Sequence, residues 1–247
     1  MYHIKGGLMK KAITASMLIF FILVCVSISL AAEKPRLGIL RFTNHTNAGW
    51  WGNTTGSDLQ DMLAAELVST KSFQVLERQE INAVLGEQDL GASGRIDRST
   101  KAKIGKIKGA QYLVAATVTS YEENTSGSGG GIGIGGFSIG GKQTKAYIAV
   151  DLKVIDATTA EVIDARSIEA NSSSGGLSLG AGVGMFSGNL SKYAKTPAGK
   201  AIRACIIEIS EYLKCSMIEG KDSSCMQGYD AKETKRRENT KKAIELE

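Results

Sequence analysis

The sequence of 247 residues has very little histidine, with only His3 and His45. His3 lies in the N-terminal segment that we interpret below as an export signal, so His45 is the only histidine of the mature chain. No serine or cysteine stands in a recognisable nucleophile setting. Zinc sites and nucleophilic triads need several such groups together, so the sequence gives no support for an enzyme, a metal site or a cofactor.

A strong charge of either sign is also lacking. The formal net charge is +5, and Lys5, Lys10 and Lys11 belong to the N-terminal segment, so the mature chain carries only about +2. Nucleic-acid-binding proteins show a much stronger basic footprint. We therefore expect no nucleic-acid partner.

Residues 1–32 have the pattern of a signal peptide. Lys10 and Lys11 precede an apolar run from Ile13 to about Val26, and Ser29-Leu30-Ala31 forms a small-x-small site, which predicts cleavage after Ala31 or Ala32. An uncleaved membrane anchor is the alternative, because an apolar stretch of about 20 residues can span a bilayer. Lipid attachment at Cys25 is a further possibility, although Val24 occupies a place that normally holds a small residue.

Glycine is abundant, and its 29 residues cluster in two segments. In Gly131–Ile139 and Leu177–Met185, apolar residues alternate with Gly or Ser, which is the period of a β-strand with one apolar face. This pattern predicts membrane-entering hairpins that several chains must pool, because two hairpins cannot close a barrel. Flexible loops are the alternative interpretation. The predicted lipid-facing residues are Ile132, Ile134, Phe137, Ile139, Leu177, Leu179, Val183 and Met185.

Gly131–Gly136 also matches the G-x-G-x-x-G fingerprint of dinucleotide-binding sites. That fingerprint requires a following helix whose N-terminus faces the pyrophosphate. Phe137-Ser138-Ile139-Gly140-Gly141 is a poor helix start, so we reject a nucleotide site.

The order of predicted elements indicates an α+β fold, with helices packed on one face of a mixed sheet and two Gly-rich β-hairpins extending from it. Thr196-Pro197 begins the last core helix, with Ile202, Cys205, Ile206, Ile209 and Leu213 on one stripe. Strands are predicted at 36–42, 73–76, 112–121, 146–154 and 161–169, and helices after Ser57, after Gln79 and, more briefly, around Ile104 and Ile107.

The cysteines near the C-terminus flank a short loop. Cys215 and Cys225 could pair in an oxidising compartment, and free thiols are the alternative. The chain divides into a folded domain at 33–215, with hairpin segments 122–145 and 172–193, and a charged tail at 216–247. The tail is predicted to be a solvated helix or a frayed end.

Three stretches of the sequence resemble the CsgG family of curli-secretion channels. They are Phe73-Gln74-Val75-Leu76-Glu77-Arg78-Gln79 with the following helix, Gly109–Val114, and the strand Ile148–Asp156 with Thr158–Val162. No single motif is decisive, but the ordered set, within roughly residues 35–214, is fairly specific.

The resemblance implies a periplasmic domain of anticodon-binding-domain-like topology. Family members form rings in which each subunit donates two β-hairpins to a shared outer-membrane barrel that passes unfolded amyloid subunits. The partners implied here are further copies of the chain, an unfolded secreted polypeptide and outer-membrane lipid, in a Gram-negative bacterium. By position, Trp50, Trp51 and Asn53 correspond to the loop that narrows the family's pore. A cap over the core is the other interpretation of the two tryptophans.

We therefore expect a non-enzymatic subunit of a homo-oligomeric secretion pore through which transport is diffusive, since no nucleotide site is present to drive it. The alternative is a periplasmic adaptor on the same fold, which stays monomeric, binds a partner protein and keeps its Gly-rich segments as loops. An enzyme is disfavoured by the missing catalytic groups.

Overall fold

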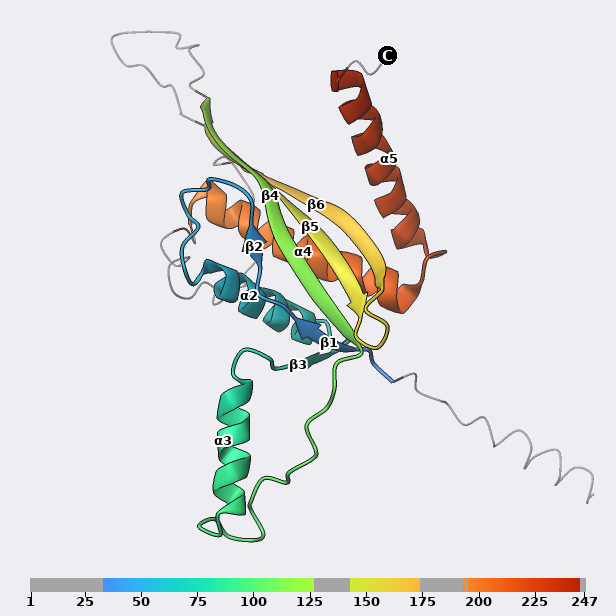
Figure 1. The fold of residues 1–247 in the computed structure, drawn as a ribbon. Helices are drawn as coiled ribbons and strands as arrows, with labels where there is room; N and C mark the ends of the chain where they lie inside the picture. Colours follow the sequence, from blue (N-terminus) through green and yellow to red (C-terminus); the bar gives the residue numbers. More distant parts are fainter. Residues whose placement is uncertain (1–32, 127–142, 174–192, 194, 245–247) are drawn as a thin grey trace, which may run out of the picture. The chain divides into compact units, whose positions relative to one another are not determined.

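The computed structural model describes residues 33–126, 143–173, 193 and 195–244. One mixed sheet forms the centre of the domain, with the strand order β3-β1-β4-β5-β6, and β2 pairs with β4 beside this path (Figure 1). The strands are β1 (Arg36–Ile39), β2 (Thr43–Asn44), β3 (Gln74–Leu76), β4 (Tyr112–Ser126), β5 (Gln143–Asp156) and β6 (Val162–Ser173).

The two halves of the sheet differ in strand direction. Strand β1 runs parallel to both β3 and β4, with Leu37 opposite Val75 on one side and Tyr112 on the other. Strands β4, β5 and β6 are antiparallel neighbours, and their pairing continues to Ser126 opposite Gln143. The three long strands thus reach the borders of the two Gly-rich segments.

Two helices cover one face of this sheet, α2 (Thr55–Ser69) and α4 (Pro197–Lys214) (Figure 1). Thr196 caps α4 by accepting a hydrogen bond from the Gly199 amide, and Pro197 begins the helix. The predicted α4 stripe is buried throughout against β5 and β6. The predicted fold class, an α+β domain with a mixed sheet covered by helices on one face, is confirmed.

Three further elements adjoin these two layers, and two of them contribute a buried core residue, Cys215 and Met226. They are α3 (Ile81–Ala92), a π-helical turn η2 (Cys215–Glu219) and α5 (Ser224–Ile244). The helix predicted around Ile104 and Ile107 is wrong, because the described chain has no helix between Ser93 and Gln111. Gly105 adopts a φ of 76° there, and Ile104 and Ile107 are exposed, so no apolar face is buried to stabilise a helix.

Candidate functional site at the roots of the glycine-rich segments

The start of α2 is held against Phe42, which precedes β2, and against the loop between β2 and α2. The Phe42 amide donates to the Gly56 carbonyl at 3.1 Å, and a β-carbon at Gly56 would lie only 2.4 Å from the Phe42 carbonyl oxygen. A side chain at position 56 would therefore force the two segments apart. The Thr55 hydroxyl adds a second tie, since it accepts a hydrogen bond from the Gly52 amide at 2.9 Å.

Trp50 packs against strand β4 and anchors this loop to the sheet. Its side chain is only 3% exposed and packs edge-to-face on Tyr121, with ring centroids 5.5 Å apart, and on Trp51 at 5.7 Å. Such aromatic pairs add about 0.5–1.5 kcal/mol beyond the burial of their area. Tyr121 is in β4, five residues before its last described residue, Ser126. The loop is thus anchored near the end of β4, from which the chain enters the first Gly-rich segment.

The same loop also contacts the chain beyond the second Gly-rich segment. The Tyr193 hydroxyl donates to the Gly49 carbonyl at 3.3 Å. Burial, followed by the Glu123 carboxylate that accepts the Tyr121 hydroxyl at 2.9 Å, raises the pKa of Tyr121 well above its ordinary value. Tyr121 is therefore an uncharged hydrogen-bonding group at neutral pH. Sequence reasoning did not identify Tyr121 and Tyr193, and the only signal for them was their position beside the two segments.

The three candidate constriction residues occupy different environments. Trp50 is buried in the hydrophobic core. Trp51 is half-buried beside it, and Asn53 is exposed, with its carbonyl oxygen accepting a hydrogen bond from the Arg41 guanidinium. Of the three candidates, only Trp51 and Asn53 are accessible to solvent in this chain.

The predicted hairpin residues lie outside the described part of the chain. Residues 127–142 contain Ile132, Ile134, Phe137 and Ile139, and residues 174–192 contain Leu177, Leu179, Val183 and Met185. Their placement in hairpins stays a prediction. Among the described residues, no helix is both long enough and apolar enough to span a bilayer.

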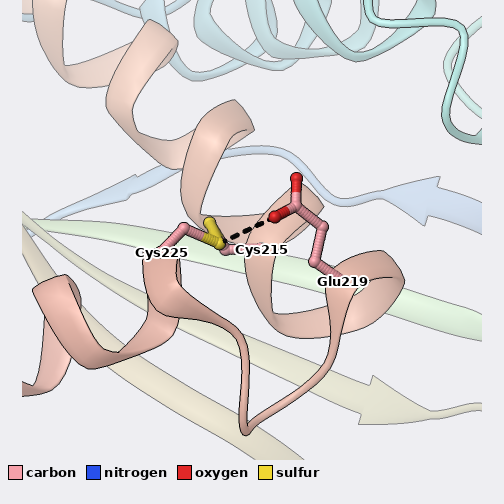
Figure 2. A group of neighbouring side chains, drawn as sticks. All are labelled: Cys215, Glu219 and Cys225. Carbon is pink, nitrogen blue, oxygen red and sulfur yellow. Dashed lines mark hydrogen bonds between the residues drawn. A yellow bond between two sulfur atoms is a disulfide. The ribbon is translucent and has the colours of Figure 1, made fainter.

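A second cluster lies where α4 passes into α5. Cys215 and Cys225 form a disulfide, and the Glu219 carboxylate approaches the Cys225 Sγ at 3.1 Å (Figure 2). Two cysteines and a glutamate are possible metal ligands, but metal-binding cysteines must be thiolates. The disulfide leaves none, so this cluster is a covalent link and not a metal centre in the oxidised chain.

The disulfide places α5 beside strand β6, where polar contacts hold the helix. The Arg166 guanidinium pairs with Asp230 at 2.6 Å and lies 5.1 Å from the centre of the Tyr212 ring. Tyr229 stacks edge-to-face on Tyr212 at 5.1 Å. Burial, together with the Asp164 carboxylate that accepts the Tyr212 hydroxyl, raises the pKa of Tyr212 to about 12. The predicted solvated tail is thus a helix whose first half is fixed to the domain, and sequence reasoning missed these contacts.

Helices cover one face of the mixed sheet (Figure 1), and the β2–α2 loop contacts Tyr121 before the first Gly-rich segment and Tyr193 after the second. These features define an α+β domain with two Gly-rich insertions. The sequence model of the CsgG family, described as the curli production assembly/transport component CsgG, matches residues 23–244. The chain belongs to this family, as the sequence motifs predicted.

Relatives and solved structures give more distant matches. The "Putative lipoprotein NMB1126/NMB1164" of Neisseria meningitidis serogroup B is 32% identical over 108 residues, which are 44% of this chain and 43% of that protein. The structure of the hypothetical protein CT253 from Chlamydia trachomatis matches with a TM-score of 0.44 and 15% identity, over 76% of this chain and 99% of that one. A PelC dodecamer from Paraburkholderia phytofirmans matches with a TM-score of 0.35 and 12% identity, over 72% and 90% of the two chains.

Proposed function

We propose that this protein is a non-enzymatic, exported subunit of a homo-oligomeric pore in the outer membrane of a Gram-negative bacterium, through which an unfolded polypeptide leaves by diffusion. The observation that carries the proposal is the family match over residues 23–244, which includes both Gly-rich segments. The name of the Neisseria relative, a lipoprotein, supports a location in the cell envelope.

The contacts of the β2–α2 loop support the same proposal. Trp50 meets Tyr121 before one segment, and Gly49 meets Tyr193 after the other. One loop thus contacts the residues that flank both segments. The same loop carries Trp51 and Asn53, the candidates for narrowing the passage.

Fractionation of the full chain tests the proposal. We expect the protein in the outer-membrane fraction, resistant to a carbonate wash, and in detergent we expect rings with a central hole by negative-stain microscopy and a multiple of the subunit mass by native mass spectrometry. A monomer that the wash releases would overturn the pore and favour the periplasmic adaptor.

Bilayer conductance tests the role of the Gly-rich segments. Ile134→Asp and Leu179→Asp place a charge on the predicted lipid-facing side, where a charge at bilayer depth is unfavourable, so channel activity should disappear. Ser138→Asp and Ser178→Asp are the matched controls on the alternate positions, and they should still conduct. Equal behaviour of both pairs would show that the alternation has no lipid-facing side.

A further inference from the structure

Exposed large apolar side chains gather in a projecting arm, residues 81–108, which contains α3 and the chain that returns to β4. Figure 1 shows α3 lying apart from the sheet, and no other described helix or strand makes more than sparse contact with it. The arm packs mainly on itself, with Gly91 against Lys101 and Ala102. Its exposed apolar residues are Val84, Leu85, Leu90, Ile104 and Ile107, and Ile104 is 63% exposed.

The return segment of the arm, residues 93–108, is strongly basic, whereas α3 carries Glu87 and Asp89. The return segment carries a single acidic residue, Asp97, whose carboxylate is engaged by the hydroxyl of Ser99. The basic side chains are all exposed, and they are Arg95, Arg98, Lys101, Lys103, Lys106 and Lys108. A surface that combines exposed aliphatic groups with one sign of charge matches a partner surface with aliphatic groups and the opposite charge.

Such a surface exists elsewhere on the same chain, at the corner between β5 and β6, residues 156–164. Val162 is 55% exposed and Ile163 is 43% exposed. The corner contains three carboxylates and no basic residue. Asp156 accepts hydrogen bonds from the Thr158 and Thr159 amides and Asp164 accepts one from the Tyr212 hydroxyl, so Glu161 is the exposed carboxylate. The Glu161 carboxylate is exposed and accepts a hydrogen bond from the Thr159 hydroxyl at 3.1 Å.

The two surfaces lie at opposite edges of the sheet, near the same ends of its strands. The arm follows β3, which is one edge of the sheet, and the corner precedes β6, which is the other edge. The arm returns to the chain at Tyr112, which pairs with Asp156 of the corner across β4 and β5. Complementary patches at opposite edges of one sheet can join neighbouring copies head to tail.

We propose that the arm, residues 81–108, docks on the β5–β6 corner, residues 156–164, of a second copy of this chain. The contact buries Val84, Leu85, Ile104 and Ile107 against Val162 and Ile163, and it sets the basic return segment beside the exposed Glu161 carboxylate. A heterologous contact of this kind closes into a ring when the rotation between copies allows it. The proposal rests on the proposed oligomeric pore and specifies which surfaces join its subunits.

A charge-swap experiment on the full chain tests the contact. Lys106→Glu and Glu161→Lys should each weaken self-association about threefold to tenfold, by sedimentation velocity in detergent, and the double variant should recover most of the loss. Lys221→Glu, which makes the same charge change at an exposed position outside the arm, is the matched control and should assemble like the wild type. Circular dichroism confirms that each variant is folded.

A cysteine pair gives a second, independent readout. Leu85→Cys and Ile163→Cys in one chain should form a ladder of disulfide-linked multimers under mild oxidation, and either substitution alone should stop at the dimer. Rings that form with no ladder and with unchanged charge-swap variants would overturn this contact and leave the pore proposal standing. A wild-type chain that stays monomeric would overturn both.

Binding to membranes is the competing use of a basic, apolar arm. Vesicles with and without anionic phosphatidylglycerol measure it directly. If Lys106→Glu reduces vesicle binding but leaves the mass of the assembled complex unchanged, the occupant of the arm is lipid and the proposed contact between copies is wrong.

Discussion

The indole of Trp50 stacks edge-to-face on the ring of Tyr121, with 5.5 Å between ring centroids and an angle of 77° between ring planes. Because Tyr121 stands near the end of β4, this contact ties the β2–α2 loop to the strand that leads into the first Gly-rich segment. Trp51 also packs edge-to-face on Trp50, with 5.7 Å between ring centroids. The loop's stability therefore depends on the buried tryptophan more than on its neighbour.

We predict that Trp50→Ala lowers the free energy of unfolding by about 3–5 kcal/mol, the usual cost of emptying a buried aromatic site. Trp50→Phe should cost less than half as much, because the indole N–H that it removes is buried and lacks a hydrogen-bond partner among the described residues. Trp51→Ala is the control, with an expected cost of about 1–2 kcal/mol. Urea unfolding measures all three, and equal costs for the two alanine variants would contradict the assignment of Trp50 as the anchor.

Gly56 offers a test of the close approach between α2 and Phe42, the residue before β2. Gly56→Ala should destabilise the domain by about 1–3 kcal/mol, since its β-carbon would clash with the backbone oxygen of Phe42. Gly86→Ala is the matched control, because a β-carbon at Gly86 of α3 meets nothing within 4 Å. In a helix interior this change should stabilise by up to about 1 kcal/mol. Thermal unfolding should thus move in opposite directions for the two variants.

The Cys215–Cys225 link predicts a redox-dependent stability. Replacing both residues by serine should cost about 2–3 kcal/mol, from the chain entropy of a loop with a sequence separation of 10. Dithiothreitol should cause a similar loss in the wild type and no loss in the double variant, which serves as the control. If reduction leaves the unfolding midpoint of the wild type unchanged, α5 is held by its polar contacts alone.

The lowered pKa of Glu233 in α5 predicts that the unfolding free energy depends on pH. Its carboxylate accepts two hydrogen bonds from Arg236 and one from Arg237, and the Arg236 contact is the main cause that lowers the pKa of Glu233 from its ordinary 4.5 to about 2. Because the folded pKa is the lower one, the contribution is fully present above about 4.5. It is lost as the pH falls from there towards 2.

The measurement compares wild type with Glu233→Gln across that pH range. The difference in unfolding free energy should be about 0.5–1 kcal/mol at pH 7, since pairs on an open helix are screened by solvent, and it should shrink to zero near pH 2. Glu238→Gln, which removes an exposed carboxylate from the same helix, is the control and should show no such trend. A difference that grows on acidification would have the wrong sign.

Local patterns in the sequence were enough to predict much of the sheet and of α4. The α4 stripe from Ile202 to Leu213 could be identified because helical periodicity depends only on near neighbours in the chain. The same reasoning failed at Ile104 and Ile107, where the apolar spacing is present but no buried face exists. Periodicity shows which residues could share a face, and only packing determines whether that face is covered.

The sequence by itself determined the α+β class, the CsgG family and the alternation of the two Gly-rich segments, since these follow from residue order and local spacing. Only the tertiary structure decided that Trp50 is core, that Tyr121 and Tyr193 meet one loop, and that Arg166 and Asp230 hold α5 against β6. These relationships join residues far apart in the chain. Their energies depend on burial and distance in three dimensions, which residue order does not specify.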